Sequence, residues 1–133
     1  MGEFEVVVGA GSLRSAGDGA VTLPHRWTAD GVSVRTEFTG AHLLHLSAAG
    51  CVLNDLYREA VALGIELAGV RVTASGGFDP ADWSSTGIRY AVELDSAAPA
   101  AALTRLLQQV DEVAEIPRTL RAGAPVHRVD LGG

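Results

Sequence analysis

The chain has 133 residues and a mass of 13.7 kDa, about the size of one domain, and residues 1–133 are expected to form a single domain. Apolar residues make up 47% of the sequence and charged residues 20%, which is typical of a folded globular protein. Ten basic and sixteen acidic residues give a net charge of −6, which argues against a nucleic-acid partner because duplex-binding surfaces are basic. All ten basic residues are arginines, so Schiff-base catalysis by a lysine is excluded.

Neither a membrane span nor a targeting signal is visible in the sequence. No stretch reaches the roughly 18 consecutive apolar residues of a membrane helix, and the first residues, MGEFEVVVGAG, lack the basic and long apolar regions of a signal peptide. The one cysteine, Cys51, excludes an intramolecular disulfide and a multi-cysteine metal site. We therefore expect a soluble, cytoplasmic domain that binds no membrane.

The N-terminal third is predicted to be an antiparallel β-meander. Short apolar runs predict strands at 4–8, 20–23 and 32–38, and glycines 9 and 11 are expected to stop the first strand. The last of these runs alternates apolar with polar residues, the pattern of a half-buried strand. The segment Thr28-Ala29-Asp30-Gly31 supplies a turn signal before it.

Residues 41–63 change to helical spacing, with apolar side chains three or four positions apart. Thr39 is the expected N-cap and Gly64 the expected C-terminal glycine of this helix. Its first half, LLHLSAAGC, is apolar nearly all round, which is typical of a helix buried on most sides. Because so small a chain has little material to surround such a helix, we expect a homodimer to cover it.

The second half predicts two strands, at 70–74 and 88–94, joined by a polar loop over 76–87. Ser96 is the expected N-cap of a second, amphipathic helix. A short helical turn is expected at 116–121 and a final strand at 126–131. The predicted order β-β-β-α-β-β-α-β describes an α+β domain with two helices against an antiparallel sheet.

Cys51 is the only soft nucleophile in the chain. A thiol becomes reactive beside a cation or a helix N-terminus, but Cys51 falls in the middle of the predicted helix. Asp55, one turn further on, would repel a thiolate and raise its pKa, whereas Arg58 is two turns away and helps only if it folds back. Local rules alone therefore favour an inert, buried cysteine.

Neither a metal ion nor a cofactor is predicted. The histidines match no metal-binding pattern, and His42 and His45, three residues apart near the helix start, have no acidic third ligand with them. The Gly9-Ala10-Gly11 turn lacks the third glycine and the following helix of a dinucleotide-binding loop.

Two segments of the chain resemble the OsmC/Ohr family. The run TGAHLLHLSAAGCVLNDLYREAVALGIELAGVRVTA, residues 39–74, is similar to the family pattern NPEELLxAAxAAC with its long helix, glycine and following strand. The run VAEIPRTLRAGAPV, residues 113–126, is similar to the pattern CPVxRTLxxGVPV, and the strand order agrees over nearly the whole chain. The resemblance implies OsmC-like antiparallel sheets with a long buried central helix, in an intertwined homodimer whose central helices pack back to back.

The resemblance also implies a thiol peroxidase reaction. In the family a peroxidatic cysteine attacks a peroxide oxygen and becomes a sulfenic acid, and a second cysteine then closes a disulfide. An arginine and a glutamate hold the first cysteine as a thiolate. Cys51 matches the peroxidatic position.

Several positions depart from the family pattern. Ala114 stands where the resolving cysteine is expected, and Ala41, with His42 beside it, stands where the glutamate is expected. Arg14 is the nearest candidate for the family's arginine and Arg35 the next. A sulfenic acid formed at Cys51 would therefore need an external thiol to resolve it.

Three hypotheses follow. The first is a hydroperoxide reductase in which Cys51 is the nucleophile, Arg14 stabilises it, and an external thiol reduces it. The second is an OsmC-like enzyme repurposed for other small-molecule chemistry, with His42 or His45 as acid or base toward an apolar metabolite. The third is a non-catalytic small-molecule binder or a purely structural protein, because a fold does not settle a function.

The second hypothesis makes a specific structural demand. Small apolar residues at Ala41 and Ala114 are expected to enlarge and dry a substrate-binding cleft beside Cys51 at the dimer interface. His42 and His45 are expected at the rim of this cleft.

Overall fold

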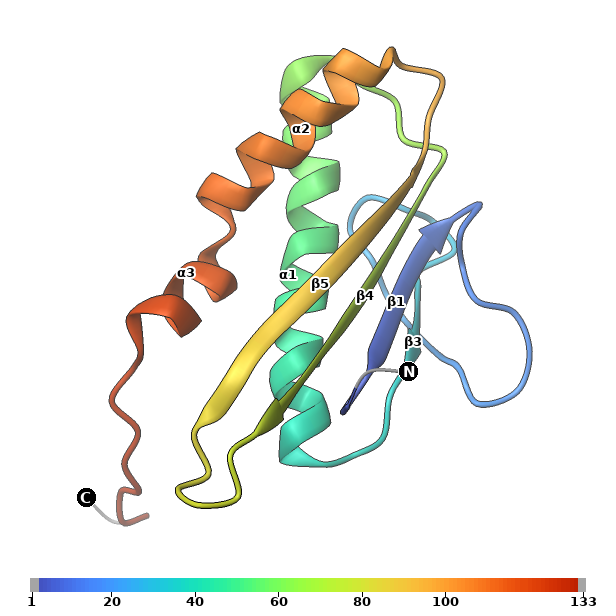
Figure 1. The fold of residues 1–133 in the computed structure, drawn as a ribbon. Helices are drawn as coiled ribbons and strands as arrows, with labels where there is room; N and C mark the ends of the chain where they lie inside the picture. The colour runs from blue at the N-terminus through green and yellow to red at the C-terminus, as the bar shows by residue number, and fades with distance from the viewer. Residues whose placement is uncertain (1–2, 132–133) are drawn as a thin grey trace.

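The computed structural model describes residues 3–131, and within them one antiparallel sheet of five strands is flanked by three helices (Figure 1). The strand order across the sheet is β2-β3-β1-β4-β5. No helix of this described part is long and apolar enough to cross a membrane. The elements in chain order are β1 (Val6–Gly11), β2 (Val21–Leu23), β3 (Val32–Arg35), α1 (Gly40–Leu63), β4 (Gly69–Phe78), β5 (Ser85–Asp95), α2 (Ala100–Val113) and α3 (Glu115–Ala122).

The long helix α1 lies along one face of the sheet, and its capping agrees with the prediction. The Thr39 hydroxyl accepts a hydrogen bond from the backbone N–H of His42 at 3.0 Å. At the other end Gly64 adopts a left-handed φ of 69°, where a residue without Cβ is favoured. Figure 1 shows α2 and α3 beside α1, so this helix is covered by the sheet on one side and by the two later helices on another.

The core is the layer between α1 and the sheet. Val52, Leu53 and Leu56 of α1 are at most 1% exposed, and they pack in one cluster with the inward-facing valines of β1 and β4. Helix α2 closes this cluster with two buried side chains of its predicted apolar face, Leu106 and Val110.

Three expectations about the strands need correction. Strand β1 runs through Gly9 to Gly11, because both of its edges are paired and the ladder continues across these glycines. The N-terminal third is not a meander, since β1 lies between β3 and β4 rather than beside β2. The connection between β4 and β5 is shorter than predicted and covers only 79–84.

Two further expectations fail in the second half of the chain. Residues 126–131 form no strand, because no edge of the described sheet pairs with them; they are irregular and exposed. Ser96 does not cap α2, because its hydroxyl donates to the carbonyl of Glu66 and accepts from the N–H of Ala98. Helix α2 begins after Pro99 instead.

Gly76→Ala is expected to lower the free energy of unfolding by about 2 kcal/mol, the usual effect of overfilling a packed core. A Cβ at Gly76 would collide with the carbonyl oxygen of Gly87 and lie 2.5 Å from Nε2 of His45. Urea denaturation followed by circular dichroism measures the change. Gly40→Ala is the matched control, since nothing lies within 4 Å of a Cβ there. Unaltered stability of Gly76→Ala would contradict this packing of α1 on β4.

Candidate functional site

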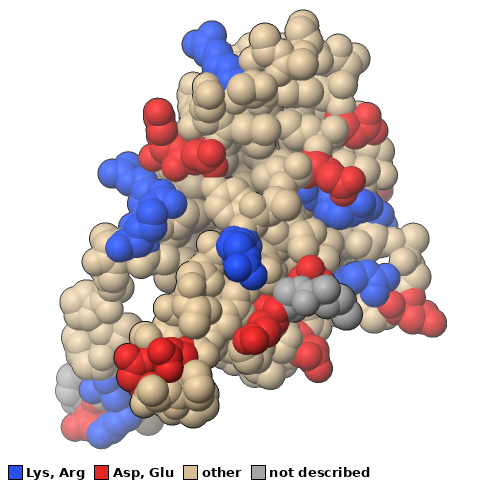
Figure 2. Space-filling model, in the orientation of Figure 1, with Lys and Arg blue, Asp and Glu red and all other residues tan. Residues whose placement is uncertain are grey.

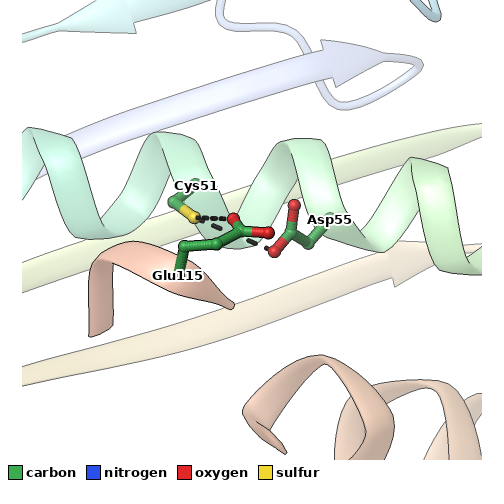
Figure 3. Close-up of side chains that lie close together, drawn as sticks. All are labelled: Cys51, Asp55 and Glu115. Atoms are coloured by element: carbon green, nitrogen blue, oxygen red, sulfur yellow. Dashed lines mark hydrogen bonds between the residues drawn. The ribbon is translucent and has the colours of Figure 1, made fainter. Parts of the chain in front are cut away.

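Cys51 lies halfway along α1 and meets the start of α3, so that its thiol faces two carboxylates. Its Sγ is 3.5 Å from Oε2 of Glu115 and 3.8 Å from Oδ2 of Asp55, as Figure 3 shows. Asp55 is one turn further along α1, on the same helix face, and Glu115 is the first residue of α3. Cys51 itself is half-buried, and Asp55 is only 3% exposed.

Within residues 3–131, Arg58 is the one arginine that contacts the two carboxylates beside Cys51. Its Nη1 is 3.2 Å from Oε1 of Glu115, and its Nη2 is 3.3 Å from Oδ2 of Asp55. No hydrogen bond from Arg58 to the sulfur is present among residues 3–131, and its charge is directed to these two carboxylates and to Glu59, whose Oε2 is 3.5 Å from Nε. The side chain therefore folds back toward Cys51, but as the partner of the acids beside it.

The environment keeps the thiol protonated. Burial is the largest cause of a raised pKa at Cys51, and the negative charges of Asp55 and Glu115 raise it further. A backbone hydrogen bond from Ile116 acts in the opposite direction without reversing the shift. The repulsion by Asp55 predicted from the helical spacing is thus confirmed.

The two acids differ in their own titration. Burial raises the pKa of Asp55, although Arg58 opposes this shift. The pKa of Glu115 is lowered, first by its own backbone N–H at the start of α3 and then by hydrogen bonds from Arg58 and Cys51. Glu115 is therefore the ionised acceptor for the thiol proton.

The same three side chains are the one cluster in residues 3–131 with the spacing of metal ligands. One thiol and two carboxylate oxygens lie within 4.8 Å of one another. Zinc accepts sulfur and oxygen ligands, but Arg58 already holds both carboxylates and would repel a cation. The arrangement fits an ion-paired acid cluster better than a metal site.

The arginines proposed from the sequence are elsewhere. Arg14 lies in the loop after β1, and its Nη1 donates to the carbonyl of Asp30 at 2.9 Å. Arg35 at the end of β3 donates to the carbonyls of Ala16 and Asp18. Both guanidinium groups fasten the β1–β2 loop, and neither is among the contacts of Cys51.

His42 and His45 face away from the thiol cluster. Nδ1 of His42 shares a hydrogen bond with the Thr39 hydroxyl at 2.6 Å, and its Nε2 is 3.2 Å from Glu37. His45 is fully buried against Phe4 and Phe78, and its Nδ1 donates to the carbonyl of Ala41 at 2.7 Å. In the described part of the chain, Nε2 of His45 has no hydrogen-bond partner.

Ala41 and Ala114, which stand where the family pattern has a glutamate and a cysteine, lie in different parts of the structure. Ala41 is in the first turn of α1 and serves His45, as described above. Ala114 is fully buried at the junction of α2 and α3, directly before Glu115. The structure therefore brings the Ala114 segment to Cys51, but it does not bring Ala41 there.

A cavity of 290 Å³ does lie beside this region, between α1, β5 and α3. Leu44 and Ala48 contribute the α1 wall, two turns and one turn before Cys51, respectively, on the same helix face. Neither histidine lines it, and neither Ala41 nor Ala114 does. In the single chain, the cavity beside α1 therefore has no histidine at its rim, and its polar groups come from β5 and α3.

The comparison with family models settles the relationship. A model described as OsmC-like protein matches residues 33–128. The chain belongs to the OsmC-like family.

Solved structures agree in fold. An OsmC-like hydroperoxide resistance protein from Jannaschia sp. CCS1 is 17% identical, with a TM-score of 0.53, over 98% of this chain and 96% of the other. An OsmC-like protein from Mycoplasma pneumoniae is 14% identical, with a TM-score of 0.57, over 72% of this chain and 83% of the other. No curated protein matches the sequence.

Sequence reasoning about this OsmC-like chain missed Glu115. The signal was present, because Glu115 directly follows Ala114 in the segment that resembles the family motif. Its partner Arg58 was identified only as a distant helical neighbour. Their meeting depends on where α3 crosses α1, which no local pattern encodes.

Glu115→Gln is expected to increase the rate of Cys51 alkylation by iodoacetamide at neutral pH about fivefold. Two unit charges about 4 Å apart in water interact by about 1 kcal/mol, and removing one favours the thiolate by that amount. Because the thiol pKa is raised, the wild-type rate should keep increasing above the pH at which an ordinary cysteine has ionised. Intact mass spectrometry across a pH series measures both effects. Glu112→Gln, an exposed acid on α2, is the control; a similar increase there would contradict the assignment.

Proposed function

We propose that this OsmC-like protein is a single-cysteine hydroperoxide reductase that takes its electrons from an external thiol. The observation that carries the proposal is the contact between the half-buried Cys51 thiol and the ionised Glu115 carboxylate, at 3.5 Å. A nucleophile with a proton acceptor in reach is the minimum that the reaction needs. The similar fold of a protein called a hydroperoxide resistance protein agrees with this reaction.

The first step oxidises the thiol by two electrons. Sγ of Cys51 attacks the terminal oxygen of the hydroperoxide, and the O–O bond breaks. Glu115 accepts the thiol proton and returns it to the departing alkoxide, which leaves as an alcohol. The products are a sulfenic acid on Cys51 and an alcohol, so that one oxygen atom passes to sulfur.

The second step returns the cysteine to its reduced form. With Ala114 in place of a resolving cysteine, a small thiol attacks the sulfenic acid, and water and a mixed disulfide form. A second thiol molecule then releases Cys51 and leaves as a disulfide of the two thiols. We assign this chemistry to the cytoplasm, where small thiols are kept reduced.

In this proposal Glu115 and Arg58 take the roles first assigned to His42 and Arg14. Arg58 holds Glu115 in place through Oε1, which leaves Oε2 for the thiol. The raised pKa of Cys51 makes the reaction slower at neutral pH than that of a preformed thiolate. The enzyme therefore depends on general-base assistance instead of a resting thiolate.

The alternative function is small-molecule binding without turnover. The specific observation that favours it is the placement of the thiol against two carboxylates, which disfavours the reactive anion. The apolar cavity beside α1 would then be the functional part of the molecule. The two functions differ in whether peroxide changes the mass of the protein.

We also propose that the active form is a homodimer. The irregular residues 126–131 expose Val126, Val129 and Leu131, which a second copy would cover. Figure 2 shows an opening between this segment and the β4–β5 hairpin in that view. The outer edges of β2 and β5 are unpaired within residues 3–131, and an edge of this kind accepts a further strand.

Exposure to cumene hydroperoxide is expected to add one oxygen atom to the wild-type protein, trapped by dimedone as the sulfenic acid of Cys51. Glu115→Gln should form this adduct more slowly even though its thiol is alkylated faster, because it can no longer return a proton to the departing alkoxide, a step that alkylation does not require. Intact mass and thiol-dependent peroxide consumption measure the two steps, and Cys51→Ser is the blank. An unchanged mass under excess peroxide would rule out the reductase and leave the binding function.

Sedimentation velocity at micromolar concentration is expected to give twice the mass of the single chain. Val129→Asp should shift the protein toward the monomer, because it places a charge in the segment that the second copy covers. Asp130→Asn is the matched control and should leave the dimer intact. A wild-type monomer, or equal association of both variants, would contradict the proposed use of residues 126–131.

A further inference from the structure

The cavity between α1, β5 and α3 has a composition that points to a particular kind of ligand. Its volume of 290 Å³ is close to the lower limit for small-molecule sites. Most of its wall is apolar, and neither Asp nor Glu contributes to the lining. The lining residues are Leu44, Ala48, Ser85, Gly87, Ile88, Tyr90, Pro117, Leu120 and Arg121.

One cation faces this apolar space. Arg121 stands in the last turn of α3, and among residues 3–131 its guanidinium group makes no ion pair or hydrogen bond. Tyr90 also lines the cavity, and its hydroxyl donates a hydrogen bond to the carboxylate of Asp111. Asp111 is therefore already engaged by Tyr90, and Arg121, an exposed residue of the cavity lining, has no polar partner within residues 3–131.

Arg121 and Tyr90 line the same cavity, and the charge of Arg121 acts on the Tyr90 hydroxyl. Burial and the bond to Asp111 raise the pKa of the Tyr90 hydroxyl to about 12, and the positive charge of Arg121 acts against that rise. Tyr90 therefore stays neutral and supplies an aromatic wall. The unpaired positive charge at this end belongs to Arg121.

We propose that this cavity binds an apolar monocarboxylate of medium chain length. The alkyl chain lies against Leu44, Ile88 and Leu120, and the carboxylate forms a two-pronged pair with the guanidinium group of Arg121. A guanidinium with unused donors beside an apolar wall matches an anionic head on an apolar body. Cys51 does not line the cavity, so binding is independent of its oxidation.

A helix-stabilising role is the competing explanation for Arg121, since a cation in the last turn of a helix interacts favourably with the helix dipole. Arg118, on the same helix but outside the cavity lining, is the control for the loss of one positive charge from α3. If the cavity binds a ligand through a guanidinium group, only the substitution of Arg121 should weaken that binding.

Isothermal titration of the full chain with sodium octanoate tests the proposal, with 1-octanol as the uncharged ligand of equal length. Octanoate is expected to bind, and Arg121→Gln should weaken it about tenfold, the usual effect of one charge-assisted hydrogen bond. Arg118→Gln should bind as the wild type does. Cys51→Ser should also bind normally, so that failure of the reductase does not affect the result.

Filling the cavity provides the second variant. Ala48→Leu should abolish octanoate binding while circular dichroism shows an unchanged helix content; if this variant fails to fold, the Arg121→Gln comparison still decides. Three outcomes would overturn the proposal: no octanoate binding to the wild type, equal affinity for octanoate and 1-octanol, or unchanged affinity in Arg121→Gln.

Discussion

The packing of α1 against the sheet is the constraint on which the rest of the structure depends. Val52, Leu53 and Leu56 are removed from water almost completely, and each buried side chain of this size contributes about 1.5–3 kcal/mol. Because 3.6 residues make one turn, committing these positions to the sheet also fixes where every other side chain of the helix lies. Cys51 and Asp55 are consequently directed to the side that meets α3 (Figure 3).

The placement of the thiol shows two effects that act in the same direction. Partial burial disfavours the thiolate, and so do the two carboxylates beside it. Arg58 offsets much of the negative charge, but it does so by pairing with the acids and not with sulfur. The result is a protonated cysteine with an ionised carboxylate at its side. This differs from the arginine-held thiolate that the family resemblance implies, and it assigns more of the chemistry to proton transfer.

The cavity and the thiol share a helix face but not a set of lining residues. Leu44 and Ala48 line the cavity, whereas Cys51 lies one turn beyond Ala48 and outside the lining, so a ligand in the cavity and an oxidant at Cys51 occupy neighbouring and distinct places. Both depend on α3, which supplies Glu115 to the thiol and Arg121 to the cavity. Movement of this short helix would therefore change both sites together.

The sequence by itself determined the fold class, the central helix with both of its caps, and the position of Cys51. These features follow from local rules, because hydrophobic spacing, a threonine cap and a left-handed glycine act within a few residues. The prediction of a strand at 126–131 is wrong. A strand needs a neighbouring strand to pair with, and the apolar pattern within a segment does not determine whether such a neighbour is within reach. The predictions for Arg14, His42 and His45 could not be decided locally either, since these side chains found nearer partners in their own loop and helix turn. Only the tertiary structure set Glu115 and Arg58 around the thiol and Arg121 at the cavity, because the crossing of α3 over α1 joins residues about sixty positions apart.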